Sequence, residues 1–226
     1  MQLGLGLYRS SLTPDNFRFA RQAGATHIVA HLVDYFAGGS PTLTTGANDM
    51  GWGVTSRHRA PWTFDELAGL RTAVEAEGLV LEAIENFDPS HWYDILLDGP
   101  QRAAQMEALK QMVRNVGRAG IPIIGYNFSI AGVWGWHKEP VGRGGAMSLV
   151  YDESRIDKNV PIPRGMVWNM RYDLAAGAGT EPKVSSTELW ERYAWFLGEL
   201  LPVAEEAGVR LALPEGPGIR VECGVA

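Results

Sequence analysis

The sequence has little cysteine and no long apolar run. Cys223 is the only cysteine, so the chain cannot form an internal disulfide, and we expect no functional role for this residue. No window approaches the roughly 18 consecutive apolar residues of a transmembrane helix. The opening residues MQLGLGLYRSS lack the basic region and apolar run of a signal peptide. These absences predict a cytoplasmic protein that has no membrane partner.

Positive charge is also scarce, with 20 Lys and Arg against 26 Asp and Glu, a net charge of −6 and a pI near 5.4. Such a chain repels polyanions on average, so nucleic acid is not an expected partner. The segment GLGLYRS does not match a dinucleotide fingerprint, and neither a GxxxxGK[ST] loop nor a GxSxG elbow occurs. Nucleotide-dependent and serine-hydrolase functions are therefore disfavoured.

What the sequence does contain is a repeat of helix and strand patterns. Four times an amphipathic helical stretch ends in glycine and an apolar, β-branched run follows at once, as expected for a helix C-cap followed by a buried strand. These glycines are Gly24, Gly78, Gly120 and Gly208. The matching helix starts are Thr13 before Pro14, and capping boxes formed by Thr63 with Glu66 and by Ser185 with Glu188.

With an opening strand at 2–8, the repeat gives five strands, all parallel because each return passes through a helix. Right-handed crossovers then leave two architectures, an open doubly wound sheet or a barrel. A complete (β/α)8 barrel takes about 250 residues. Here five strands use nearly all of the 226 residues, so a barrel would be incomplete.

Two long connections, residues 34–62 and 129–184, follow strands and so lie at the C-terminal face, where loops carry the chemistry in both architectures. Their aromatic and cationic side chains suit a mobile cover that grips a carboxylate. A solvated surface, with arginines paired to surface acids, explains the same composition. These side chains are Trp52, Arg57, His58, Arg59, Trp62, Trp134, Trp136, His137, Lys138, Arg143, Arg164 and Arg171.

Polar residues also gather where two of the strands end. Oxygen and imidazole donors follow the strand LVLEAIE, and together they suit Mn²⁺, Fe²⁺ or Zn²⁺. These donors are Glu85, Asn86, Asp88 and His91. A plainer interpretation has Glu82 facing a helix end or an arginine, and His91 capping a helix. The next strand ends in GYNFS, where Tyr126 and Asn127 can orient a polyhydroxylated substrate.

Several of these segments resemble the D-mannonate dehydratases, a metal-dependent family of the xylose-isomerase-like barrel group. IPIIGYNFSIAGVW is similar to the family strand CYNF, which a tryptophan follows eight residues after the tyrosine, here Trp134. LEAIENFDPSH resembles the segment leading to a ligand histidine, and one inserted residue brings His91 to that position. The helix and strand from Glu188 to Leu213 resemble those before the family's metal-binding histidine motif.

The resemblance implies an α/β fold of parallel (β/α) TIM-barrel type, incomplete with about five to six of eight βα units, in a single domain over residues 1–226. It implies a hydro-lyase that converts D-mannonate to 2-keto-3-deoxy-D-gluconate in hexuronate breakdown. The implied cofactor is Mn²⁺, with Fe²⁺ or another divalent metal as alternatives. His91 and Glu215 are then the metal ligands, and the substrate-binding residues are Tyr126, Asn127, Trp134 and Arg171.

The sequence departs from the family at two ligand positions. The cysteine of CYNF is replaced by Gly125, and the family motif AVHPDDPP reads LALPEGPG, with Glu215 near the first acid. The tail GIRVECGVA no longer resembles the family, which suggests a frameshift or premature end near Pro214. The catalytic acid and base stay unassigned, since the family's remaining strands have no counterpart here.

These departures leave two alternatives to the dehydratase. One is a sugar isomerase or epimerase of the same barrel group, whose ligand set differs. The other is a sugar-acid-binding remnant without catalysis. An incomplete barrel also exposes a strand edge and apolar helix faces, so we expect a homo-oligomer.

Overall fold

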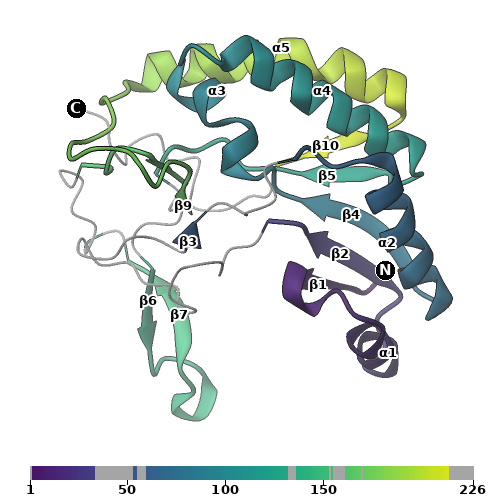
Figure 1. Cartoon of the computed structure of the whole chain (residues 1–226). Helices are drawn as coiled ribbons and strands as arrows, with labels where there is room; N and C mark the ends of the chain where they lie inside the picture. The colour runs from purple at the N-terminus through teal and green to yellow at the C-terminus, as the bar shows by residue number, and fades with distance from the viewer. Residues whose placement is uncertain are drawn as a thin grey trace.

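Five parallel strands form the main sheet of the molecule (Figure 1). The computed structural model describes residues 2–33, 53–54, 60–131, 136–152, 154, 161–168 and 170–213. The strands are β1 (Gly4–Tyr8), β2 (His27–His31), β4 (Val80–Glu85), β5 (Ile123–Gly125) and β10 (Arg210–Ala212). Each lies within a run that the helix and strand repeat predicted.

The order of the strands in space decides between the two predicted architectures. The sheet runs β1-β2-β4-β5-β10, which is the order along the chain, and all four pairings are parallel. A doubly wound sheet would reverse direction at a switch point, whereas a barrel adds each strand beside the previous one. The prediction of a parallel (β/α) barrel type, incomplete over the part described, is therefore confirmed.

Helices cover one face of this sheet (Figure 1). The helices that return between strands are α1 (Pro14–Gln22), α2 (Phe64–Ala76), α4 (Arg102–Arg118) and α5 (Ser186–Ala207). A 3-10 turn, η2 (Pro89–His91), and the short helix α3 (Tyr93–Leu97) follow β4. None of the helices in the described part of the chain combines the length and apolar character needed to cross a bilayer.

The helix ends follow the sequence signals closely, with one difference. Gly24, Gly78, Gly120 and Gly208 all have positive φ, between 67° and 92°. Ser185 and Glu188 form the complete predicted capping box. Thr63 accepts the backbone N–H of Glu66, but the Glu66 carboxylate binds Arg9 at 3.2 Å, so the second half of that box is replaced by an ion pair from another element.

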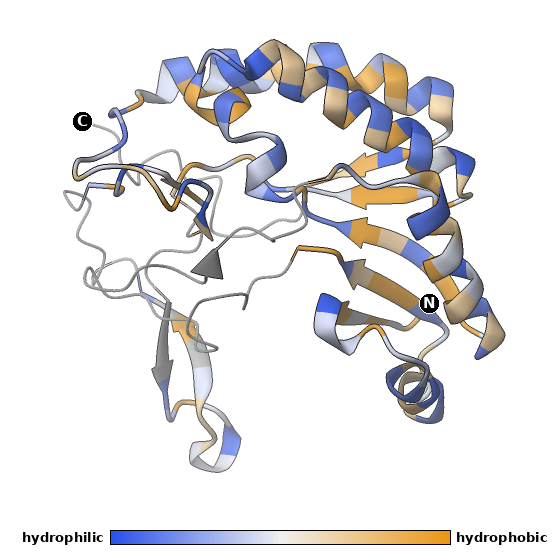
Figure 2. Cartoon of the chain, in the orientation of Figure 1, coloured by the Kyte–Doolittle hydropathy of each residue, from blue (hydrophilic) through white to orange (hydrophobic). Residues whose placement is uncertain are grey.

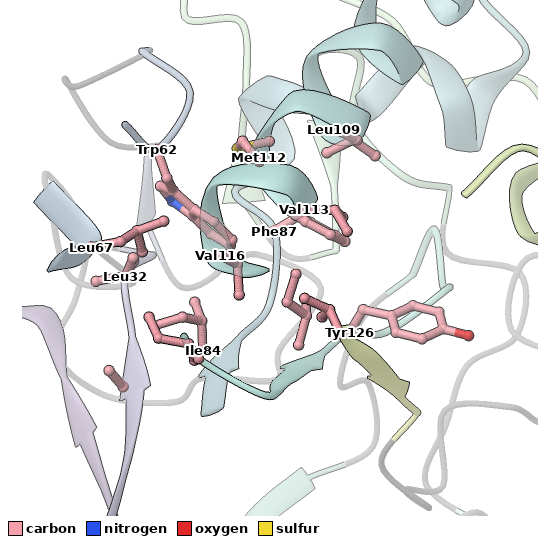
Figure 3. Close-up of a cluster of buried hydrophobic side chains, with 14 of the residues drawn as sticks. Leu32, Trp62, Leu67, Ile84, Phe87, Leu109, Met112, Val113, Val116 and Tyr126 are labelled. Atoms are coloured by element: carbon pink, nitrogen blue, oxygen red, sulfur yellow. The ribbon is translucent and has the colours of Figure 1, made fainter. Parts of the chain in front are cut away.

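The main core lies between the sheet and these helices (Figures 2 and 3). Ile28 and Ile84 point from the sheet towards fully buried residues of the helices, among them Leu109 and Phe196. Burying each such side chain contributes about 1.5–3 kcal/mol. Trp62, which the sequence offered as a loop aromatic, stacks on Phe87 in this core. Trp62 therefore packs in the core and does not belong to a cover over the substrate.

Short strands that the sequence did not predict lie within the two long connections. β3 (Gly53–Val54), β8 (Met166–Val167) and β9 (Met170–Arg171) form one small sheet, and β6 (Trp136–Glu139) pairs with β7 (Ser148–Tyr151). Two single turns, η1 (Arg9–Ser11) and η3 (Arg143–Gly145), complete the elements. Figure 1 places β3, β9, β6 and β7 beyond the ends towards which β2 and β4 point.

Candidate functional site

A row of side chains crosses the inner face of the sheet at its C-terminal edge. The parallel register pairs Tyr8 with His31, His31 with Glu85, Glu85 with Gly125, and Gly125 with Ala212. Register partners on neighbouring strands point to the same face. The last residue of each strand therefore contributes to one continuous row, opposite the helices.

An imidazole and a carboxylate meet in this row. His31 Nε2 lies 3.4 Å from Glu85 Oε2, and the Tyr8 ring is tilted against the imidazole with 5.0 Å between centroids. Burial lowers the pKa of His31, and the neighbouring Glu85 carboxylate acts in the opposite direction. The net lowering favours a neutral imidazole, which keeps a lone pair on one nitrogen.

A second polar group lies closer to the start of the strands. Glu82 Oε2 is 4.0 Å from His27 Nε2, and Glu82 Oε1 is 3.8 Å from Arg210. The inner face of a (β/α) barrel is usually filled by branched apolar residues. The plainer interpretation of Glu82, that it faces an arginine, fits this arrangement. Sequence reasoning did not single out His27 or His31, although two histidines four apart on a strand share a face.

Two glycines lie in close contact with the His31 and Glu85 pair. A Cβ built on Gly125 would lie 3.3 Å from Glu85 Cγ, and one on Gly6 would lie 3.5 Å from His31 Nε2. Gly125 has no positive φ, so its backbone conformation does not require glycine, but a side chain there would press against Glu85. The position that the resemblance equates with a cysteine ligand thus faces the row directly but supplies no donor atom.

Two asparagines join the ends of β4 and β5. Asn86 has a φ of 66°, a left-handed conformation that asparagine tolerates better than most residues, and its N–H donates to the Gly125 carbonyl at 2.8 Å. Asn127 Nδ2 donates to Asn86 Oδ1 at 2.9 Å. Asn127 therefore lies beyond the strand end, as the sequence predicted, with its amide oriented by Asn86.

The structure places Tyr126 differently from its neighbours. Its side chain is 3% exposed and belongs to the buried cluster of Figure 3. It packs against Phe196 of α5 and shares a hydrogen bond of 2.8 Å with the Tyr193 hydroxyl. Burial, followed by the Tyr193 contacts, raises the pKa of the phenol, which stays protonated. Because neighbouring residues of a strand face opposite sides, the tyrosine after Gly125 turns towards the helices.

The other predicted metal ligands and substrate-binding residues either lie on separate elements or fall outside the described residues. His91 is buried in η2, where Asp88 Oδ1 accepts the Ser90 N–H and hydroxyl at 2.9 and 2.7 Å. Arg171 belongs to β9 in the small sheet. Trp134 and Glu215 lie outside the described residues. Within the described ranges, no three His, Cys, Asp or Glu side chains are grouped to hold a metal.

Known proteins resemble this chain over most of its length. The model of the family D-mannonate dehydratase (UxuA) matches residues 17–222. Mannonate dehydratase 2 of Halalkalibacterium halodurans is 29% identical over 166 residues, which are 69% of this chain and 47% of that protein. Mannonate dehydratase of Streptococcus suis is 32% identical over 167 residues, 69% of this chain and 44% of that protein. The chain thus spans about half the length of these curated relatives.

A solved structure supports the same fold. The crystal structure of mannonate dehydratase from Streptococcus suis serotype 2 superposes with a TM-score of 0.61 at 23% identity, covering 94% of this chain and 53% of that chain. Since the family model covers far more than half of the sequence and the strand order agrees with a barrel, this chain belongs to the D-mannonate dehydratase family.

Proposed function

We propose that this chain acts in the dehydration of D-mannonate to 2-keto-3-deoxy-D-gluconate, a step of hexuronate breakdown, with a divalent metal. The observation that carries the proposal is the family match over residues 17–222. The polar row at the C-terminal edge of the sheet agrees with it, because active sites of (β/α) barrels lie at that edge. A cytoplasmic location remains a prediction from the sequence.

The reaction needs a proton removed from C2, the loss of the C3 hydroxyl as water, and rearrangement of the resulting enol to the ketone. A divalent metal, when bound, would withdraw charge from the carboxylate and so make the C2 proton easier to remove. Asn127 is the proposed hydrogen-bond partner of a substrate hydroxyl, and the bond that its amide donates to Asn86 supports this proposal by orienting the amide. Arg171 is the proposed partner of the substrate carboxylate, and Trp134 the proposed aromatic contact. Tyr126 supports the strand end from the core side, a role that its contacts favour over direct binding.

The residues present fit a metal only in part. Gly125 has no donor atom where the resemblance expects a cysteine, and the described residues contain no group of three ligands. His91 and Glu215 stay the ligands proposed by resemblance. Mn²⁺ is the metal we propose, and the mixture of nitrogen and oxygen donors also suits Fe²⁺.

The test is incubation of the purified chain with D-mannonate and added Mn²⁺, followed by NMR detection of the 2-keto-3-deoxy acid. D-gluconate, which differs only at C2, serves as the substrate control, and a chelator serves as the metal control. We expect product from D-mannonate alone, and only with metal. Absence of product with Mn²⁺, Fe²⁺ and Zn²⁺ would reject the proposed activity for this chain.

The absence of a cysteine at Gly125 favours a second candidate activity, that of a sugar isomerase or epimerase of the same barrel group. The same NMR experiment in D₂O separates the two. Deuterium entering C2 without loss of water indicates the second activity. A ligand shift on binding, without exchange or product, indicates a non-catalytic binding protein.

A further inference from the structure

The antiparallel hairpin of β8 and β9, residues 166–171, packs against the chain beyond two strands of the main sheet. Trp168 and Met170 form a small buried cluster with Val33, which lies two residues after β2. The Trp168 N–H also donates to the carbonyl of Ile130, which follows β5, at 2.6 Å. These contacts hold β9 beyond the C-terminal ends of the strands (Figure 1). The hairpin therefore lies at the edge where (β/α) barrels carry their active sites.

A pair of stacked tyrosines ties the end of this hairpin to α3. The ring centroids of Tyr172 and Tyr93 are 4.0 Å apart, and the ring planes are within 7° of parallel. Gln101 Nε2 donates to the Tyr93 hydroxyl at 2.7 Å, so the ring on α3 is itself held in place. Tyr93 comes two residues after His91, and Tyr172 comes directly after Arg171. The stack thus joins the segment of a proposed metal ligand to that of the proposed carboxylate partner.

A single carboxylate closes the open end of the hairpin. Glu181 Oε1 accepts the Gly165 N–H at 2.6 Å and the Tyr172 hydroxyl at 2.9 Å. Gly165 directly precedes β8, and Tyr172 directly follows β9. Burial of Tyr172, followed by the bond to Glu181, raises the pKa of the phenol, which stays protonated and donates. Because hydrogen bonds to a charged acceptor are stronger than those between neutral groups, Glu181 fixes both ends of the hairpin.

Arg171 lies between these fixed points. Its neighbour Met170 is fully buried, and Arg171 itself pairs in register with Met166 of β8 and Val54 of β3. Two strands and Tyr172 therefore set the position of its backbone, and its side chain is half-buried. A guanidinium binds a carboxylate through two parallel hydrogen bonds, a geometry that depends on where the side chain begins.

Ordering a cationic side chain and the loop that carries it costs free energy on binding, and a loop that is already ordered removes part of that cost. We propose that the Tyr93–Tyr172 stack and the Glu181 carboxylate position Arg171 to bind the carboxylate of a sugar acid. The inference rests on the proposed function in taking Arg171 as the carboxylate partner. Tyr93, Tyr172 and Glu181 are positioning residues, because they act through Arg171.

Paired variants separate the two contacts of Tyr172. Tyr172→Phe keeps the ring stack and removes the bond to Glu181, whereas Tyr172→Ala removes both. Glu181→Gln keeps an oxygen that can accept both bonds, whereas Glu181→Ala keeps none. Glu188→Ala is the matched control, since that carboxylate also accepts one N–H and one hydroxyl, both from Ser185. Glu188 lies in the first turn of α5, outside the hairpin.

The first experiment measures the Kd of D-mannonate for the full chain by isothermal titration calorimetry, with Mn²⁺ in both solutions. We expect Arg171→Ala, Tyr172→Ala and Glu181→Ala each to raise the Kd about tenfold, the factor for one lost hydrogen bond to a charged group. Tyr172→Phe and Glu181→Gln should lie between these variants and the unmodified chain. Glu188→Ala should leave the Kd unchanged.

A double-mutant cycle separates positioning from a general loss of structure. If Glu181 acts through Arg171, Glu181→Ala has nothing further to remove in the Arg171→Ala background, so the double variant should match Arg171→Ala within about twofold. A damaged fold would instead add its own loss. Hydrogen exchange followed by mass spectrometry gives a measurement without ligand. The amides of β9 should exchange faster in Glu181→Ala than in the unmodified chain or in Glu188→Ala.

The outcomes separate this inference from the proposed activity. Turnover of D-mannonate with a Kd that does not respond to the Tyr172 and Glu181 variants would overturn the positioning role and leave the activity standing. Losses that add fully in the cycle, or unchanged exchange of β9, would overturn the role as well. Binding that depends on these residues, without turnover, would support the role and reject only the dehydratase activity. Absence of D-mannonate binding by the unmodified chain would overturn both.

Discussion

At the residue scale, Phe196 of α5 is the point where four aromatic side chains meet. Its ring lies 5.3–6.4 Å from the rings of four neighbours. Those neighbours are Trp92, Tyr126, Phe128 and Tyr193. The ring is 0% exposed, so its removal leaves a cavity that these large neighbours can fill only in part.

We expect Phe196→Ala to lower the free energy of unfolding by about 3–5 kcal/mol. Phe19→Ala on α1 is the control, because this ring is 62% exposed and its loss should change the free energy by less than about 0.5 kcal/mol. Urea unfolding followed by tryptophan fluorescence measures both. Similar losses for the two variants would contradict the assignment of the core.

Asn86 has a left-handed backbone conformation, and its side chain accepts a hydrogen bond from Asn127. Its left-handed φ of 66° disfavours residues with a Cβ by roughly 1–2 kcal/mol. We expect Asn86→Ala to be more destabilising than Asn86→Gly by about 1 kcal/mol, since both lose the bond to Asn127 but glycine accepts the φ. Paired urea titrations give the difference. Equal stabilities of the two variants would contradict the prediction and mean that the backbone at position 86 relaxes to another φ.

At the element scale, the start of α5 depends on its capping box. Ser185 Oγ accepts the Glu188 N–H at 3.3 Å, and the Glu188 carboxylate accepts the Ser185 N–H at 2.8 Å. Ser185→Ala should lower the free energy of unfolding by about 1 kcal/mol. Thr187→Ala, an exposed change in the same turn, should have a smaller effect. Thermal unfolding compares the two.

The same box predicts a pH dependence. Hydrogen bonds from the Ser185 side chain and backbone lower the pKa of Glu188 below its ordinary value. The pKa of Glu188 is thus lower in the folded chain than in the unfolded chain. The ionised carboxylate therefore contributes its full share of the free energy of unfolding above the ordinary glutamate pKa, and this contribution disappears as the pH falls through the lowered, folded-state pKa. The stability difference between the unmodified chain and Glu188→Gln should therefore shrink in acid. A difference that stays constant from neutral to acid pH would argue against the box.

At the scale of the whole molecule, the main sheet has two edge strands, β1 and β10, each of which pairs on one side only within the described residues. On α5, Trp190 and Leu201 are 50% and 42% exposed. Apolar faces and unpaired edges of this kind favour association. We expect multi-angle light scattering to detect a homo-oligomer, weakened by Trp190→Ser with Leu201→Ser. A stable monomer at high concentration would contradict this expectation.

Local signals were enough to predict the elements from the sequence. A helix often ends in a residue with positive φ, and glycine adopts that conformation most easily. Gly24, Gly78, Gly120 and Gly208 have such φ angles, which is why they marked the helix ends in the sequence. Ser185 and Glu188 form their box because both partners lie within one turn. The two-to-four-residue strands of the long connections were missed, since so few residues carry no periodic pattern.

Interactions between distant segments could not be predicted in this way. Only the folded structure reveals that Glu66 binds Arg9 instead of completing its capping box, and that His31 faces Glu85 on the neighbouring strand. It also turns Tyr126 towards α5 while Gly125 faces the row. The sequence by itself thus determined the order and type of the elements and the family, because these depend on neighbours along the chain. The helix and strand pattern left two architectures and the family resemblance implied the barrel type, which the strand order then confirmed. Only the tertiary structure decided the partners in the row, because these depend on register between strands far apart in sequence.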